Sequence, residues 1–213
     1  MAMEIRVLDH GYVRLIDFMG GDRRVAETAR ISTMTKGDEE SDAKLIRYLI
    51  KMGHGTPFEH SYFTFYVKCP IFVARQWFRH RISSYNEMSM RYCVADREYY
   101  VPENLEEEER KAYVEAVERA FDTYDHLITA GIRKEQARGV LPTSVYTQFY
   151  WTVNARSLMN FLDLRLDMSA QYEIRQYARA IFTIFSEKMP HTAAAFRDLI
   201  LGEMKRPITE KEI

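Results

Sequence analysis

Hydrophobic residues recur at two different intervals along this chain. Between residues 4 and 18, apolar and polar positions alternate on either side of Gly11, which predicts a β-hairpin whose turn the glycine supplies. Over residues 39–52 the apolar positions instead recur every three or four residues and stop at Gly53, as in an amphipathic helix. A run rich in aromatic and β-branched residues predicts a strand at residues 62–68, and residues 145–153 are the best candidate for a second strand. We also predict helices at residues 22–31, 70–78, 103–129, 133–138, 154–166, 170–188 and 192–201.

Two short polar sequences indicate how helices begin. Asp22 can cap the first helix, and the order Thr56-Pro57-Phe58-Glu59 is that of a capping box on a very short helix. Residues 80–92 have mixed periodicity, so we assign them to no element. We therefore expect an α+β fold, a helix-rich single domain over residues 1–213 with a small, mostly antiparallel sheet.

The composition excludes several classes of protein. No apolar run is long enough for a membrane span, and the first residues lack the hydrophobic core of a signal peptide. Cys69 and Cys93 cannot form a disulfide framework, which fits a reducing compartment. With 30 Lys and Arg against 31 Asp and Glu, the chain lacks the basic excess of proteins that coat nucleic acid. We expect a soluble cytoplasmic protein.

The positive charge is unevenly divided, because the chain has 21 arginines and 9 lysines. Arginine suits bidentate recognition of phosphate and stacking on rings. The densest cluster of arginines runs from Arg75 to Arg97, and Glu87 is the single acid between Arg75 and Arg91. Uncharged hydrogen-bonding residues separate these arginines, which favours a nucleotide pocket over the alternative of a solvated, ion-paired loop.

A second candidate lies on the helix predicted after Asn154. Arg165 falls on the same stripe as Leu158 and Phe161, where an apolar residue is expected. A buried guanidinium requires an anion or several acceptors, although an arginine near a helix end can also extend its head group into water. Arg156 and Asn160 lie four residues apart on an adjoining face, so three polar groups can converge on one ligand.

Other candidate sites have simpler explanations. Arg138 ends a short helix, where a cation complements the helix dipole. His54 and His60, with Glu59 and His80, fit no metal-binding spacing, so we expect structural histidines and no metal. The turn at Thr56 could present backbone N–H groups to a phosphate. Rossmann and P-loop glycine motifs are absent from the sequence, and neither cysteine lies in a setting typical of a nucleophile.

One motif is specific enough to indicate a family. Residues 79–91, RHRISSYNEMSMR, match the pattern R-H-R-x-x-S-x-N-E-x-S-x-R at all its specified positions, and the chain thereby resembles the flavin-dependent thymidylate synthases. The segments 54–60, 70–80, 137–142 and 151–165 are also similar to that family. The resemblance implies a homotetramer whose sites between subunits bind FAD and dUMP. The implied reaction converts dUMP to dTMP, with carbon from 5,10-methylenetetrahydrofolate and reducing equivalents from NADPH through the flavin.

The resemblance also assigns residues to ligands. The residues assigned to dUMP are Gln76, Arg79, Glu87, Ser89, Met90, Arg91, Arg138 and Arg165, and the family motif leaves the position of Met90 open. The residues assigned to FAD are His54, Thr56, Arg79, His80, Arg81, Glu87, Asn154, Arg156 and Asn160. Arg165 corresponds to the catalytic arginine that favours ionisation at N3 of uracil, and for Ser89 we expect binding rather than nucleophilic attack.

Three other functions are compatible with a cluster of this kind. They are a different flavoprotein, a nucleotide hydrolase, and an RNA- or nucleotide-binding module without catalytic activity. The intact motif counts against the two enzymes, and the neutral net charge counts against the binding module.

Overall fold

A five-stranded antiparallel sheet, in the order β1-β2-β3-β5-β4, forms the centre of the computed structural model, which describes residues 3–202. Its strands are β1 (Glu4–Val7), β2 (Gly11–Met19), β3 (Tyr62–Pro70), β4 (Ser84–Glu87) and β5 (Tyr146–Asn154). The long strands β3 and β5 pair over their whole length, from Tyr62 opposite Asn154 to Pro70 opposite Tyr146. The expected α+β class and antiparallel sheet are confirmed.

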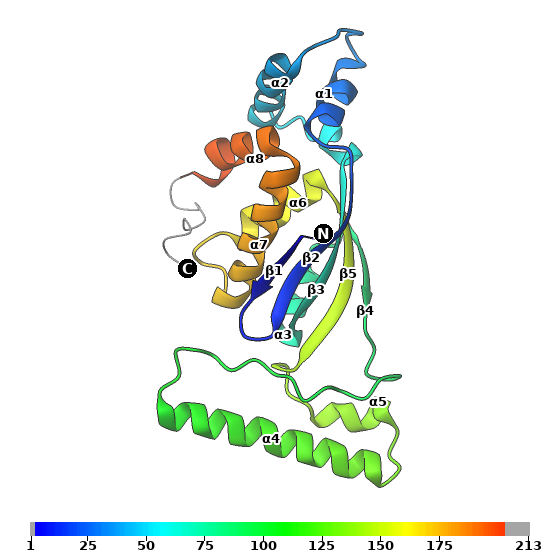
Figure 1. Cartoon of the computed structure of the whole chain (residues 1–213), viewed down its shortest axis with the longest axis vertical. Helices are drawn as coiled ribbons and strands as arrows, with labels where there is room; N and C mark the ends of the chain where they lie inside the picture. Colours follow the sequence, from blue (N-terminus) through cyan, green and yellow to red (C-terminus); the bar gives the residue numbers. More distant parts are fainter. Residues whose placement is uncertain (1–2, 203–213) are drawn as a thin grey trace.

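The helices lie beside the sheet and at its two ends (Figure 1). The α-helices are α1 (Asp22–Arg30), α2 (Glu39–Lys51), α3 (Ile71–Trp77), α4 (Glu107–Thr129), α5 (Lys134–Ala137), α6 (Ala155–Arg165), α7 (Tyr172–Lys188) and α8 (Pro190–Phe196). Short turns of other helix types are η1 (Thr56–His60), η2 (Arg138–Val140) and η3 (Arg197–Leu201). None of the helices in the described part of the chain combines the length and apolar character needed to cross a membrane.

Side chains from one face of the sheet form the main hydrophobic core with α3, α6 and α7. Alternate residues of β3, including Phe63, Phe65 and Val67, are fully buried, because successive side chains of a strand point to opposite faces. A second, smaller cluster lies below the sheet, where α4 runs across the molecule (Figure 1). We call this region the lower lobe, and its core consists of Met90, Ala95, Val117, Phe121, Tyr124, Ala137 and Val145.

The glycine of the predicted hairpin is required for a different reason from the one expected. The hairpin forms, but its turn places Leu8 rather than Gly11 in the left-handed region, with φ of 57°. A Cβ atom on Gly11 would lie 1.9 Å from the Tyr177 hydroxyl oxygen, which donates a hydrogen bond to the Lys68 carbonyl at 2.8 Å. Gly11 therefore provides space for a contact between α7 and the sheet.

Both predicted helix caps are wrong. Gly55 precedes η1 without a side-chain cap, so the expected capping box of Thr56 and Glu59 does not form. Asp22 is the first residue of α1 and makes no cap bond there. Its carboxylate instead accepts hydrogen bonds from the backbone N–H groups of His191 and Thr192, at 2.7 and 3.1 Å, and from the Thr192 hydroxyl. Asp22 thus accepts hydrogen bonds from two backbone amides at the start of α8 that have no partner within that helix. These bonds connect α8 to α1.

The unassigned segment 80–92 contains β4, which the alternation of side chains did not reveal. β4 is an edge strand paired with β5 alone, and three of its four residues are exposed. Only Tyr85 turns its ring toward the core, where it packs against Phe78 and Phe149. A single buried side chain leaves no detectable period, since two or more are needed to show alternation.

We expect Asp22→Ala to lower the melting temperature by roughly 4–8 °C, since it removes a charged acceptor of three hydrogen bonds, worth about 2 kcal/mol. Scanning calorimetry at fixed protein concentration provides the measurement. The control is Glu27→Ala, which removes only exposed ion pairs with Arg23 and Arg24 and should shift the melting temperature by less than roughly 2 °C. Equal shifts in the two variants would show that Asp22 does not cap α8.

Candidate active site

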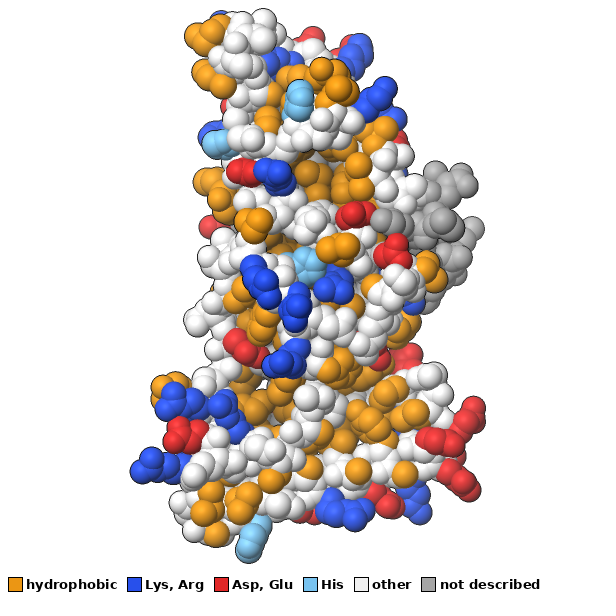
Figure 2. Space-filling model, turned by 180° about the vertical axis from the view of Figure 1, so that it is seen from behind, with side chains coloured by type: hydrophobic (Ala, Val, Ile, Leu, Met, Phe, Trp, Pro, Cys, Tyr) orange, Lys and Arg blue, Asp and Glu red, His pale blue; other side chains and the backbone are white. Residues whose placement is uncertain are grey.

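The largest group of residues assigned from the sequence lines one hollow beside β5, which we call the central cavity. Its volume of about 630 Å³ lies within the range of small-molecule sites. The assigned residues that line it are Arg79, His80, Arg81, Asn154, Arg156, Asn160 and Arg165. They come from three elements, namely the segment after α3, the end of β5, and α6. On the face seen in Figure 2, blue Lys and Arg side chains gather around a histidine at mid-height.

A buried tryptophan places the Arg79-His80-Arg81 segment at the cavity. Trp77, the last residue of α3, is fully buried, and its ring stacks on Phe161 of α6 with centroids 4.8 Å apart. The same ring meets Trp151 of β5 edge-on at 5.2 Å. Arg79, His80 and Arg81 begin two residues after Trp77. The packing of Trp77 therefore determines where these three residues lie.

A tyrosine then holds the turn that follows α3. The Tyr85 hydroxyl lies 3.1 Å from the Trp77 carbonyl oxygen and 2.9 Å from that of His80. Burial raises the pKa of Tyr85 to about 12, so the hydroxyl remains a donor at physiological pH. The Ser83 hydroxyl donates a second bond to the His80 carbonyl at 2.8 Å. The backbone of His80 is therefore held from two sides.

Arg165 turns its head group toward the protein, which argues against the alternative of an arginine extended into water. Its Nε donates to His80 Nε2 at 3.0 Å, and its Nη2 donates to the Gln76 carbonyl at 3.2 Å. Burial lowers the pKa of Arg165, and burial followed by the Arg165 charge lowers the pKa of His80 to about 4. At neutral pH, His80 is uncharged and Arg165 keeps its charge, because arginine does not deprotonate in proteins.

The central cavity has a marked excess of positive charge. Four arginines line it, and Glu59 is the single carboxylate among its lining residues. Glu59 pairs with Arg156, whereas Arg79, Arg81 and Arg165 make no ion pair within residues 3–202. Arg79 and Arg81 are exposed and Arg165 is partly buried, so all three guanidinium groups can pair with an anionic ligand.

His54 and Thr56 line a second hollow of about 880 Å³ between α1, α2 and η1, which we call the upper cavity. The Tyr48 ring meets His54 edge-on there, with centroids 6.0 Å apart. Arg156 borders both cavities. A Cβ atom on Gly55 would lie 2.5 Å from Arg156 Nε, so this glycine allows the arginine to lie against the backbone between the two hollows.

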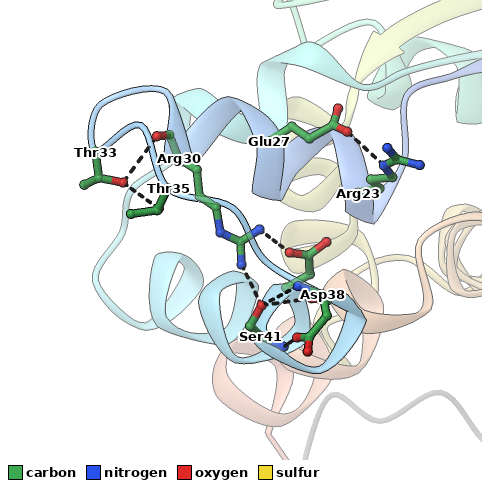
Figure 3. A network of polar contacts seen from close by, with 8 residues as sticks. Arg23, Glu27, Arg30, Thr33, Thr35, Asp38 and Ser41 are labelled. Atoms are coloured by element: carbon green, nitrogen blue, oxygen red, sulfur yellow. Dashed lines mark hydrogen bonds and ion pairs between the residues drawn. The ribbon is translucent and has the colours of Figure 1, made fainter.

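Arg30, which lines the upper cavity, belongs to a network of polar contacts (Figure 3). Arg30, at the end of α1, pairs with Asp42 in the first turns of α2, and the two side chains are only 13% and 14% exposed. Its second nitrogen donates to the Ser41 hydroxyl at 3.0 Å, and Ser41 forms a capping box with Asp38. The pair thus connects the end of α1 to the first turns of α2, across the loop of residues 31–38.

The remaining assigned residues lie outside the two cavities. Glu87 accepts a hydrogen bond from the Thr147 hydroxyl at 2.7 Å, and Ser89 Oγ accepts one from the Arg91 backbone at 3.3 Å. Arg91 pairs with Glu135 at 2.9 Å. Met90 is buried in the core of the lower lobe, so its side chain is not available to a ligand.

Gln76 and Arg138 occupy different positions again. Gln76 is partly exposed at the end of α3, and its side-chain amide donates to Gln171. Arg138 caps the end of α5 with an exposed side chain, which is the position that the helix-dipole explanation requires.

The assigned residues of one chain therefore form separate groups. Thr147, which contacts Glu87, lies four residues along β5 from Trp151 and seven from Asn154, both of which line the central cavity. At about 3.3 Å per residue, these separations correspond to roughly 13 and 23 Å. The dUMP assignments in the lower lobe lie beyond Glu87 along the chain, away from Arg165.

The structure adds residues that the sequence did not assign. Ile82 and Leu164 line the central cavity and are 77% and 52% exposed, so they provide an apolar rim. Tyr85 and Glu59 act on assigned residues through the hydrogen bonds and the ion pair described above. An aromatic residue inside the motif was a usable signal for Tyr85, whereas the pairing of Glu59 with Arg156 depends on the tertiary fold.

Neither cysteine lies at a cavity. Cys69 is fully buried, and burial raises its pKa well above the ordinary value of a thiol. Cys93 is exposed in the segment that leads to the lower lobe. Within the described residues no three His, Cys, Asp or Glu side chains are grouped closely enough to hold a metal ion.

Comparisons with known proteins give consistent results for the family and the fold. The family model described as thymidylate synthase complementing protein matches residues 14–191. A flavin-dependent thymidylate synthase of Thermotoga neapolitana is 52% identical, over 91% of this chain and 94% of the relative. One from Thermus thermophilus is 46% identical, over 93% of this chain and 80% of the relative. The solved structure of the UMP/dUMP methylase PolB from Streptomyces cacaoi, bound to 5-Br dUMP, superposes with a TM-score of 0.85 at 34% identity, over 92% of this chain and 98% of PolB.

We expect Arg30→Met to lower the free energy of unfolding by about 3 kcal/mol, because Asp42 would remain buried without a counter-ion. Urea denaturation followed by tryptophan fluorescence, at fixed protein concentration, measures this. The double variant Arg30→Met/Asp42→Leu should recover most of the loss, since no unpaired charge remains. Failure of the second substitution to restore stability would show that the arginine acts through packing rather than through charge.

Proposed function

Because the chain belongs to the thymidylate synthase complementing protein family, we propose that its central cavity is the active site of a flavin-dependent thymidylate synthase. The activity is the flavin-dependent synthesis of dTMP from dUMP, with FAD as the cofactor. The observation that carries the assignment of the cavity is its set of arginines without internal counter-ions, which suits two phosphate-bearing ligands.

The residues at the cavities fit a flavin dinucleotide. Arg79 and Arg81 supply free positive charge for a diphosphate, and the apolar rim of Ile82 and Leu164 suits a planar ring. The Asn154 side-chain oxygen caps α6 by accepting from the Ser157 N–H at 2.9 Å, which leaves the amide nitrogen for a ligand. The residues of the two cavities that would hold FAD are His54, Thr56, Arg79, His80, Arg81, Asn154, Arg156 and Asn160. Glu87, which lies outside both cavities, would reach FAD from another subunit. The bound flavin supplies the redox chemistry of the reaction.

Arg165 is the residue that acts on the pyrimidine. The atoms that hold its guanidinium, on His80 and Gln76, are neutral, so its positive charge is not cancelled by the protein. Placed near N3 and O2 of uracil, this charge stabilises negative charge on the ring and makes C5 a better nucleophile. The scheme uses no thiol, in agreement with the distance of both cysteines from the cavities.

A second subunit completes each site in this proposal. Gln76, Arg79 and Arg165 lie together, whereas Glu87, Ser89, Met90, Arg91 and Arg138 lie toward or within the lower lobe. If one dUMP contacts both groups, they must come from different chains, and a homotetramer with sites between subunits provides this arrangement. Met90 would contribute only backbone atoms. The co-substrates are 5,10-methylenetetrahydrofolate as carbon donor and NADPH as reductant, and the protein acts in the cytoplasm.

The first test concerns the flavin and Arg165. The protein saturated with FAD should show a flavin spectrum that bleaches with NADPH and changes on addition of dUMP. Arg165→Ala should keep the flavin spectrum and lose at least 100-fold in turnover, since it removes preorganised charge from the pyrimidine. The control is Arg47→Ala, which removes an exposed ion pair between two residues that line neither cavity, Arg47 and Asp198.

Two results would contradict this proposal at different levels. A protein that gains no flavin spectrum on incubation with FAD is not a flavin enzyme. A normal spectrum with near-normal turnover in Arg165→Ala would leave the activity in place and remove the role of Arg165.

A mixing experiment tests the shared sites. Arg165→Ala and Arg91→Ala should each be inactive alone, whereas co-expressed hybrids should regain activity, because about one quarter of the sites receive both intact arginines from different chains. The matched control mixes Arg165→Ala with Arg79→Ala, two residues of the same cavity, which should give no recovery. Recovery in the control as well, or in neither mixture, would rule out this division between chains.

A further inference from the structure

The atoms that hold the Arg165 guanidinium differ from those around Arg30 and Arg97. Arg30 pairs with one carboxylate, and Arg97 lies within 2.9 Å of carboxylate oxygens from three acidic residues of α4. Arg165 instead donates to an imidazole nitrogen and a backbone carbonyl. The protein thus fixes the position of this arginine with neutral acceptors only.

The contact with His80 determines where the imidazole carries its proton. Arginine Nε is always a donor, so His80 Nε2, at 3.0 Å, must present its lone pair. A neutral ring with a lone pair on Nε2 carries its hydrogen on Nδ1. His80 can therefore donate from Nδ1 to a ligand in the cavity, and it cannot accept there.

The surroundings of His80 hold its ring in one orientation. The ring meets Phe161 of α6 edge-on, with centroids 4.9 Å apart and planes at 69°. Its backbone carbonyl is bonded to the hydroxyl groups of Tyr85 and Ser83. An acceptor held this firmly can define the direction of the guanidinium that it binds.

We propose that His80, as the Nδ1–H tautomer, is a positioning residue that orients Arg165 toward the pyrimidine while leaving its positive charge uncancelled. A carboxylate at the same place would orient the guanidinium equally well, but its negative charge would compensate the charge that the pyrimidine needs. The inference rests on the proposed function, which assigns Arg165 to the nucleotide.

Substitutions that keep or remove the acceptor test this role. His80→Gln places a neutral carbonyl oxygen near the position of Nε2, and His80→Leu has a comparable size without an acceptor. Both variants are compared with the parent protein, each saturated with FAD, and dUMP affinity is measured by calorimetry and by the change in the flavin spectrum. We expect His80→Leu to raise the dUMP Kd about tenfold or more, and His80→Gln to keep it within about threefold.

A double-mutant cycle separates positioning from a general structural role. In the Arg165→Ala background, His80→Leu should change the dUMP Kd by less than about twofold, because the group that His80 orients is already absent. If His80→Leu weakens dUMP binding equally with and without Arg165, the positioning role is overturned. Equal Kd values for the Leu and Gln variants at position 80 overturn it as well.

The tautomer can be observed without any ligand. In ¹⁵N NMR of histidine-labelled protein at pH 7, we expect one neutral ring with its proton on Nδ1 whose signals disappear in His80→Gln. An Nε2–H ring or an imidazolium at this position overturns the inference even if dUMP binds normally. Failure of the parent protein to bind dUMP would instead contradict the proposed function, while the NMR result would still report on His80.

Discussion

Packing of one buried indole determines where the polar groups of the active site can lie. Trp77 contacts Trp151 of β5, Phe161 of α6 and Tyr177 of α7, and is fully buried among them. The sheet and two helices thus meet at a residue that lies two positions before the arginine motif. Large aromatic side chains contribute much of the stability of a core, and their packing tolerates little displacement. The position of the residues that line the central cavity therefore depends on the packing of Trp77.

Local patterns predicted most of the fold, and contacts distant in sequence account for the remainder. The strands β3 and β5 coincide with runs rich in aromatic and β-branched residues, and the helix α2 follows from apolar residues spaced three to four apart. The strand β4 could not be found, because Tyr85 is its one side chain packed on the core. The role of Asp22 was equally hidden, since its partners at the start of α8 lie 169 and 170 residues away in the chain.

The sequence motif predicted which residues form the site, and it gave no information on their arrangement. Arg79, His80 and Arg81 line the same cavity of one chain as Asn154 and Arg165. Arg91 and Arg138 do not, because β4 directs the end of the motif toward the lower lobe. Spacing along a chain cannot show whether an arginine has a counter-ion, which distinguishes the structural pair of Arg30 and Asp42 from the free Arg79 and Arg165.

The uncompensated charge of the central cavity also couples ligand supply to the survival of the protein. Arg79, Arg81 and Arg165 come together only in the folded chain, so an anionic ligand that contacts them binds the folded state. A ligand that binds only the folded chain stabilises it by about 2.7 kcal/mol when its concentration is about a hundred times Kd. Depletion of nucleotide or flavin would therefore increase the unfolded fraction that proteases can degrade. Through this linkage, the steady-state amount of the protein in a cell would rise and fall with the concentrations of its ligands.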